Sequence, residues 1–164
     1  MNFGVFFGPE RIGTLESAAG RLRFQYAPDY VGRVDRTVSV RLPPRAEPYA
    51  DDETRVYFAN LLPEDEYRRL LARELGVADR NVAGLLAAIG GECAGAVSVW
   101  PEGKAPHAQV RYERLDDSAV RELFAAGSAA ERRALIREGR LSLAGGMEKI
   151  GLRRMRGEIG RAHV

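Results

Sequence analysis

Leu22-Arg23-Phe24-Gln25-Tyr26 alternates strictly between large apolar and polar side chains. Because successive side chains of a strand point to opposite faces, this alternation predicts a β-strand with its three apolar side chains on one face. Two more β-prone runs precede it, at residues 3–7 and 12–16, and glycine or proline residues separate the runs. Short strands divided by such turns are typical of an antiparallel meander.

The alternation returns at residues 37–42, which read Thr-Val-Ser-Val-Arg-Leu. This run predicts a further strand. Pro43 and Pro44 would end it, because proline has no N–H to donate to a neighbouring strand. Residues 45–53 are mostly polar and predict a loop.

Helical spacing follows. Residues 63–66, Pro-Glu-Asp-Glu, place proline and acids where a helix N-terminus favours both. An apolar stripe at helical spacing continues the helix, and Gly76 would end it; the stripe contains Tyr67, Leu70, Leu71 and Leu75. Asp79 or Asn81 can cap a second helix that would end at Gly90-Gly91, and its expected apolar face contains Val82, Leu85, Leu86 and Ile89.

The rest of the chain is expected to alternate between strands and helices. Residues 97–100 predict a strand, residues 101–104 a turn and residues 109–113 the returning strand. Helices are expected from Asp116 or Ser118 to about Gly139, followed by a strand at 149–154. We place a boundary near Leu115, between a compact α/β module and a helical connector.

Composition excludes several classes of protein. The chain has 164 residues, 45% of them apolar, and a formal net charge of +2. This length suits one domain, or one domain with part of another. We find neither a signal peptide nor a membrane span, and the single cysteine, Cys93, excludes an internal disulfide. We therefore expect a cytoplasmic protein that has no membrane partner and does not bind nucleic acid directly.

Isolated reactive residues have ordinary structural explanations. Cys93 lies among small residues, and no motif places either histidine beside it, so it is predicted to be a buried structural cysteine. The same scarcity predicts no metal site. The acids at 64–66 and 116–117 suit helix starts, and Asn60 suits a turn or a cap. The arginine pairs at 132–133 and 153–154 are read as solvated charge, although they could contact phosphates or a partner.

The run Leu-Ser-Leu-Ala-Gly-Gly-Met-Glu-Lys at residues 141–149 has features of an anion-binding loop. Gly145 and Gly146 allow the backbone to approach a ligand closely, and exposed N–H groups in such a loop can surround an anion. Ser142 adds a hydroxyl and Lys149 a positive charge. The spacing does not match a Walker A loop. An ordinary Gly-Gly turn before a strand is the alternative.

This loop resembles the Ser-x-Ala-Gly-x-Gln-x-Lys loop of the HipA family of bacterial serine/threonine kinases, the toxin half of a toxin–antitoxin pair. Three upstream segments resemble the same family in the same order; they are residues 57–64, 89–96 and 112–115. The resemblance extends from the first strand to about Arg156. Met147 stands where the family has glutamine, which removes an amide from the loop.

The resemblance implies an α+β fold in three parts. Residues 1–115 would form a HipA-type N-terminal module of antiparallel strands with packed helices. Residues 116–140 would form the helical connector, and residues 141–157 would begin a kinase core with its glycine-rich loop and a strand. By the same resemblance, Ser142 is the serine that such kinases autophosphorylate. The nucleotide-phosphate loop then contains Ala144, Gly145, Gly146 and Lys149.

The family also implies partners and cofactors. A full-length parent would use ATP and Mg²⁺, phosphorylate a protein substrate and bind a HipB-like DNA-binding antitoxin. In this family the catalytic and metal-binding residues follow the glycine loop, and no segment here resembles them. We therefore assign no catalytic or metal-binding residue and expect the chain alone to be inactive, with the remaining kinase lobe as its natural continuation.

Residues 158–164, Glu-Ile-Gly-Arg-Ala-His-Val, do not resemble the family. They resemble the translation of a common DNA-sequencing adapter, so we predict that they are not native. Two alternatives to a kinase fragment remain. The chain could be a stand-alone interaction module that binds and restrains a separate HipA-like kinase. It could also be an unrelated small α/β binding protein.

Overall fold

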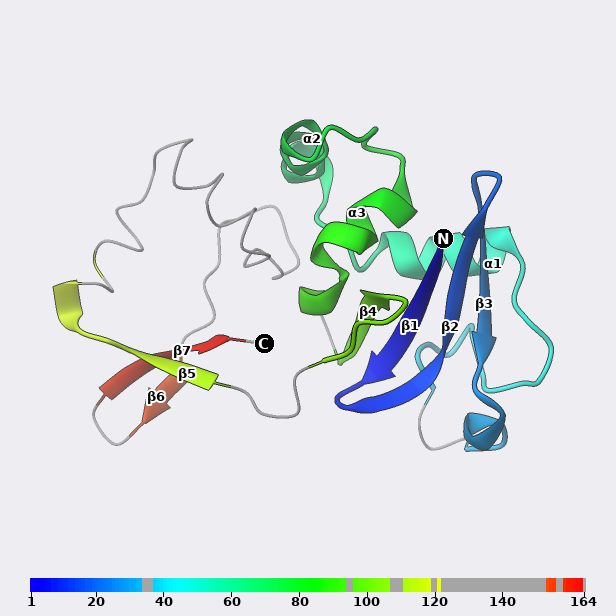
Figure 1. The fold of residues 1–164 in the computed structure, drawn as a ribbon, viewed down its shortest axis with the longest axis horizontal. Helices are drawn as coiled ribbons and strands as arrows, with labels where there is room; N and C mark the ends of the chain where they lie inside the picture. Colours follow the sequence, from blue (N-terminus) through cyan, green and yellow to red (C-terminus); the bar gives the residue numbers. More distant parts are fainter. Residues whose placement is uncertain are drawn as a thin grey trace.

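A computed structural model gives the fold, which is drawn in Figure 1. It describes residues 1–33, 37–93, 96–106, 111–118, 121, 153–155 and 158–163. The largest sheet has four antiparallel strands in the order β3-β2-β1-β4. Its strands are β1 (Asn2–Phe7), β2 (Glu10–Ala18), β3 (Arg21–Tyr26) and β4 (Val97–Pro101).

The predicted meander is confirmed by β1, β2 and β3, which pair in sequence order. In β3, Leu22, Phe24 and Tyr26 are all buried, and the residues between them are exposed. Strand β4 pairs with β1 on the other side, so that Val5 lies opposite Val99. The predicted strand at 97–100 is therefore confirmed, and it closes the sheet from a distant part of the sequence.

Two of the helices match the predictions. Helix α2 (Asp65–Glu74) starts with the expected acids, and Gly76 follows it in the left-handed conformation with a φ of 65°. Helix α3 (Val82–Ile89) is capped by Asn81, whose side chain accepts a hydrogen bond from the Gly84 N–H at 3.0 Å. The predicted apolar face of α3 is buried throughout.

Helix α1 (Asp51–Ala59) corrects the prediction of a polar loop at 45–53. Three consecutive acids from Asp51 to Glu53 form its first turn, where the helix dipole favours negative charge. Thr54 and Phe58, one turn apart, are its buried residues. Asn60 is the C-cap of this helix, in agreement with its predicted role as a turn or capping residue.

The predicted strand at 37–42 is wrong. The chain turns here and forms only an isolated bridge between Ser39 and Leu42. The Thr37 hydroxyl lies 2.6 Å from the Ser39 carbonyl oxygen, and the Ser39 hydroxyl accepts from the Arg41 N–H at 3.2 Å. Such local bonds offer the backbone an alternative to a sheet, and they leave Val40 92% exposed at the turn.

The core lies between the four-stranded sheet and the helices. Helix α1 contacts β3, and α3 and the short helix η2 (Gly90–Glu92) contact β4. Phe24 is at the centre of an aromatic cluster, with ring centroids 4.7 Å from Tyr26, 6.3 Å from Tyr49 and 5.4 Å from Phe58. A second short helix, η1 (Pro28–Tyr30), adds Tyr30, which stacks on Tyr26.

Both edges of this sheet are covered. At β3, Phe24 exchanges two backbone hydrogen bonds with Tyr49, and the Leu22 N–H donates to the Asp51 carboxylate. At β4, Gly90 lies against the backbone, where an added Cβ would be 2.4 Å from the Val99 carbonyl oxygen. The Gly90-Gly91 pair thus allows close contact with β4, a second role besides ending α3. Covered edges do not pair with other chains.

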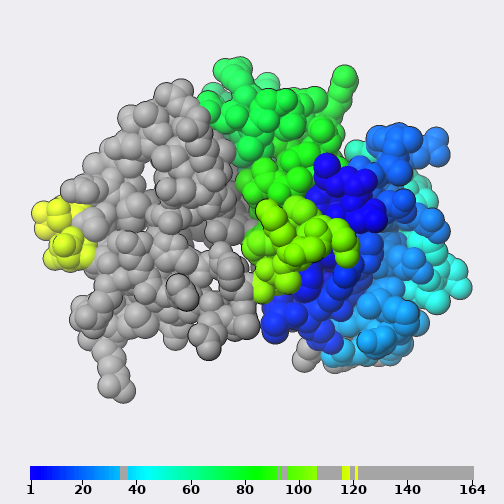
Figure 2. All heavy atoms as spheres, viewed as in Figure 1, coloured from blue at the N-terminus to red at the C-terminus, as the bar shows by residue number. Residues whose placement is uncertain are grey.

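A smaller sheet contains β5 (Arg111–Leu115), β6 (Arg153–Met155) and β7 (Glu158–His163) in the antiparallel order β5-β7-β6. This corrects the expected returning strand, because β5 pairs with β7 and not with β4. The predicted strand at 149–154 is found partly, as β6. Figure 2 shows the same view with all heavy atoms, in which the four-stranded sheet and its helices form one continuous body.

The antiparallel sheets and packed helices confirm the α+β class. Most of the predicted helical connector and the whole glycine-rich loop lie outside the described residues. The division into a module, a connector and a kinase core therefore stays a prediction. In the part of the chain that the structure describes, every helix is too short or too polar to cross a membrane.

Candidate binding site

The site residues predicted from the sequence lie outside the described residues; they are Ser142, Ala144, Gly145, Gly146 and Lys149. The structure therefore does not test whether they come together. What it does describe is two surface hollows that share Leu22 at the start of β3. Their charges differ, and that difference identifies which one suits a ligand.

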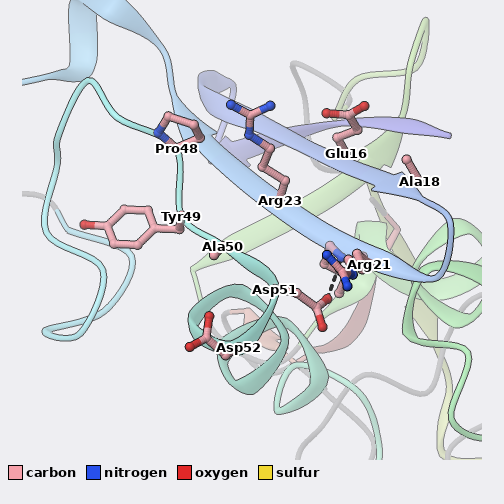
Figure 3. A pocket seen from close by; sticks show the side chains of 10 residues that line it. Glu16, Ala18, Arg21, Arg23, Pro48, Tyr49, Ala50, Asp51 and Asp52 are labelled. Carbon is pink, nitrogen blue, oxygen red and sulfur yellow. Dashed lines mark hydrogen bonds between the residues drawn. The ribbon is translucent and has the colours of Figure 1, made fainter.

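The first hollow, shown in Figure 3, has a volume of about 790 Å³. It lies between β2, β3 and the segment that leads into α1. Its charged residues carry both signs; they are Glu16, Arg21, Arg23, Asp51 and Asp52. Glu16 and Arg23 are paired across neighbouring strands, and Asp51 lies beside Arg21 (Figure 3). Because these charges offset one another, the hollow has no evident preference for a charged ligand.

An ion pair on α1 lies between the two hollows. Asp51 lines the first and Arg55 the second. Arg55 donates from Nη2 to Asp51 Oδ1 at 2.7 Å and from Nε to Oδ2 at 3.1 Å. These bonds from Arg55, aided by the Leu22 N–H at 2.6 Å, hold the pKa of the Asp51 carboxyl below its ordinary value. Asp51 is thus ionised at neutral pH. It lines the first hollow, and Arg55 and the Leu22 N–H hold its carboxylate in place.

The second hollow has a volume of about 830 Å³ and lies between the β2–β3 turn, α1, α2 and the start of α3. We call it the basic hollow, because its charged groups are the Met1 ammonium, Arg55, Arg68 and Arg80. None of the described residues that line it is acidic. Small apolar side chains line the space between the charges; they are Ala59, Ala78, Val82 and Ala83, with Leu22.

Arg68 is a partly buried arginine of the basic hollow that uses little of its bonding capacity. Its Nη2 donates to the Ala59 carbonyl oxygen at 3.4 Å, a long and weak bond. Its Nε is buried and has no hydrogen-bond partner among the described residues. A guanidinium has five N–H donors, and a buried donor without a partner is costly. An anion in the hollow would bind the remaining Nη donors of this guanidinium, since the Nε atom itself is buried.

Other groups add positive potential without offsetting acids. The Arg80 side chain is exposed and has no hydrogen bond or ion pair with the other described residues. The N-terminus of α3 also lines the hollow, and a helix N-terminus carries partial positive charge. Sequence reasoning missed this grouping, since Arg55, Arg68 and Arg80 share no motif and belong to three different segments.

The partly buried thiol of Cys93 and phenol of Tyr57 do not form a reactive site. Burial raises the pKa of Cys93 to about 12, and burial is also the main cause that raises the pKa of Tyr57 to about 12. Cys93 is therefore a neutral thiol at physiological pH, as expected of a structural cysteine. Within the described residues, no three His, Cys, Asp or Glu side chains are grouped as metal ligands.

Comparisons with known proteins agree with this architecture. A family model described as "HipA N-terminal domain" matches residues 3–100. A curated protein of Sinorhizobium fredii (strain NBRC 101917 / NGR234), named "Putative kinase Y4mE", is 38% identical over 130 residues. That match covers 74% of this chain and 30% of the relative, so the chain spans under a third of the relative's length.

A solved structure shares the fold. HipA of Shewanella oneidensis MR-1, in complex with HipB and operator DNA, superposes with a TM-score of 0.68 at 24% sequence identity. The superposition covers 97% of this chain and 37% of that HipA chain. The described fold is therefore that of a part of the longer protein.

Proposed function

This chain belongs to the family of the HipA N-terminal domain, and from that premise we propose that it is the N-terminal part of a HipA-like serine/threonine protein kinase toxin. The observation that carries the proposal is the match over residues 3–100, which spans the whole four-stranded sheet and its helices. The likeness to the Sinorhizobium protein supports it, because it extends over more residues than the family model matches.

The proposal gives the glycine-rich loop a role. In the full-length kinase, Ala144, Gly145, Gly146 and Lys149 would contact the phosphates of ATP, and Ser142 would be the autophosphorylated residue. The described residues contain no group of carboxylates suited to Mg²⁺. In the full-length kinase, other residues would bind this ion. The chain by itself would not transfer phosphate, because none of its segments resembles a catalytic loop.

The partner would be a HipB-like DNA-binding antitoxin in the cytoplasm. The support is that the structurally similar HipA of Shewanella oneidensis was solved with HipB and operator DNA. The antitoxin gene is expected beside the kinase gene. Co-expression of that neighbour with the chain, followed by size-exclusion chromatography, tests the pairing. Elution of both proteins in one peak is the expected result, and separate elution at micromolar concentration would count against it.

Phosphoryl transfer is tested on the full-length protein that the source gene encodes. The source gene is resequenced across codons 150–170 with outside primers, and the full-length protein is incubated with ATP and Mg²⁺. We expect phosphate on Ser142, no transfer by the present chain alone, and loss of the label in Ser142→Ala. Ser128→Ala in the connector is the matched control and should keep the label. Transfer by the present chain alone would contradict the proposal.

A stand-alone module that restrains a separate HipA-like kinase is the second candidate. One observation favours it, since the four-stranded sheet buries its own core and both of its edges are covered. The two candidates predict different genes. A natural stop after this chain, followed by a separate kinase gene whose activity falls when the chain is added, would support the module. A continuous frame into kinase motifs would exclude it.

A further inference from the structure

We infer that the basic hollow binds a carboxylate-bearing segment of another protein, an acidic side chain with apolar neighbours. The inference rests on the described N-terminal module and holds whether the chain is a kinase fragment or a separate module. Its starting point is the half-buried guanidinium of Arg68, whose Nε has no partner in the part of the chain that the structure describes. Charged groups that are buried without a partner are rare, because the cost of removing them from water is large.

The charges of the hollow select an anion. The Arg68 side chain makes one weak bond, the Arg80 side chain makes none with the described residues, and Arg55 has an unused Nη1 beside its bonds to Asp51 and to the Gly20 carbonyl oxygen. None of the described residues that line the hollow is acidic, and Asp51, outside it, forms its ion pair with Arg55. Guanidinium groups bind carboxylates through two parallel N–H···O bonds, which adds geometric selectivity to the charge attraction.

The apolar lining selects a peptide from among the anions. Leu22, Ala59 and Val82 lie between the cationic groups and would be in contact with aliphatic side chains. Inorganic phosphate would leave this surface uncovered. A nucleic acid presents phosphates at regular intervals and is bound along a basic strip, whereas the positive groups here surround a single hollow. A short acidic and apolar segment matches both the charge and the surface.

The test uses the full chain and a fluorescein-labelled peptide, Gly-Ala-Leu-Glu-Glu-Leu-Ala-Gly. A second peptide carries Gln in place of both Glu. Fluorescence anisotropy gives the Kd, and ¹⁵N chemical shifts identify the amides affected. We expect the acidic peptide to bind at least tenfold more tightly than the Gln peptide, because each charge-assisted bond contributes about a tenfold factor or more. The largest shifts are expected at Leu22 and at Val82.

Matched variants locate the interaction. Arg68→Gln should weaken binding about tenfold. Arg69→Gln removes the same charge from the exposed neighbouring position on α2 and should change the Kd less than twofold. If Arg68→Gln disturbs the fold, as judged by circular dichroism, Arg80→Gln gives the same test. Arg80 lies in an exposed loop, and its side chain has no bonded partner among the described residues.

Several results would overturn the inference. They are no binding of the acidic peptide at millimolar concentration, equal binding of the two peptides, or equal effects of the Arg68 and Arg69 variants. Two other occupants would also replace it. A DNA duplex that binds in an Arg68-dependent manner, without peptide binding, would make the hollow a phosphate site. A dimer in sedimentation experiments, lost in Arg68→Gln and insensitive to peptide, would make it a contact between copies of the chain.

Discussion

The two sheets of this protein are built in different ways. Strands β1, β2 and β3 follow one another along the chain, and the sheet that they form with β4 is covered by helices and closed at both edges. In the other sheet, β7 is the middle strand and pairs with both β5 and β6. It is close in sequence to β6 and distant from β5. Each sheet thus contains one pairing between distant segments, β1 with β4 and β5 with β7, and the first sheet also has a core of its own beneath its helices.

This difference can be measured with one probe. Trp100 is the only tryptophan of the chain and lies in β4, opposite Gly4 of β1. Its fluorescence reports unfolding of the four-stranded sheet and not of the smaller one. The following predictions use urea unfolding followed by Trp100. The two sheets would not differ in this way if a substitution in either sheet changed the Trp100 unfolding transition equally.

The largest effect is expected from Phe24→Ala. Phe24 is fully buried at the centre of the aromatic cluster, so its removal leaves a cavity against Tyr26, Tyr49 and Phe58. Substitutions of this kind lower the free energy of unfolding by about 3–5 kcal/mol. Val40→Ala, at a side chain that is 92% exposed, is the control and should change it by less than about 0.5 kcal/mol. Similar losses in both variants would mean that the cluster does not hold this sheet together.

A smaller loss is expected from Gly90→Ala at the β4 edge. The added methyl would lie 2.4 Å from the Val99 carbonyl oxygen, and a backbone atom cannot move aside easily. Overpacking of this kind costs about 1–3 kcal/mol. Gly91→Ala is the comparison, since its methyl would meet the Trp100 ring, a side chain that can shift. A larger loss in Gly91→Ala would show that backbone contact does not set the position of η2.

Asp51→Asn should lower the free energy of unfolding at pH 7 by about 1 kcal/mol, since the pair with Arg55 is about one third exposed and screened by solvent. The folded-state pKa of Asp51 is depressed, so its contribution is present above the unfolded pKa, near 4, and is lost as the pH falls through the lower folded value. The difference from the unchanged chain should therefore shrink below pH 4. Asp52→Asn, the exposed neighbour, should show a smaller difference at pH 7. A constant difference from pH 7 to pH 3 would contradict the assignment.

The smallest effect is expected from deletion of residues 158–164. The deletion removes β7 and leaves β5 and β6 without their shared partner. Because sites without shared contacts contribute independently, the Trp100 transition should move by less than about 0.5 kcal/mol. Amide exchange in residues 111–115 should accelerate in the same variant. A large shift of the Trp100 transition would show that the two sheets unfold as one unit.

The sequence predicted much of the first sheet because its signals are local. Alternation in Leu22–Tyr26 identified which face of β3 is buried, and Asn81 with the apolar spacing after it identified α3. The prediction failed at residues 37–42, where the same alternation is overridden by side-chain bonds of Thr37 and Ser39 to nearby backbone. It also missed α1, although three acids followed by Thr54 and Phe58 at helical spacing were a usable signal.

The candidate site shows the same difference between what local sequence signals predict and what they miss. A resemblance in the glycine-rich loop led to the family, and the match over residues 3–100 confirmed membership, but Ser142 and its neighbours lie outside the described residues. The basic hollow had no sequence signal, because its arginines come from α1, α2 and the loop before α3.

By itself, the sequence determined the buried faces of β3 and α3, where α2 and α3 begin, and which family the chain belongs to. These properties depend on neighbours within a few residues, so spacing and local bonding reveal them. Only the tertiary structure decided that Gly90 must accommodate the backbone of β4, that Asp51 covers the edge of β3, and that the Arg68 Nε is buried without a partner among the described residues. Those contacts join residues distant in sequence, and their energies depend on distances that folding alone sets.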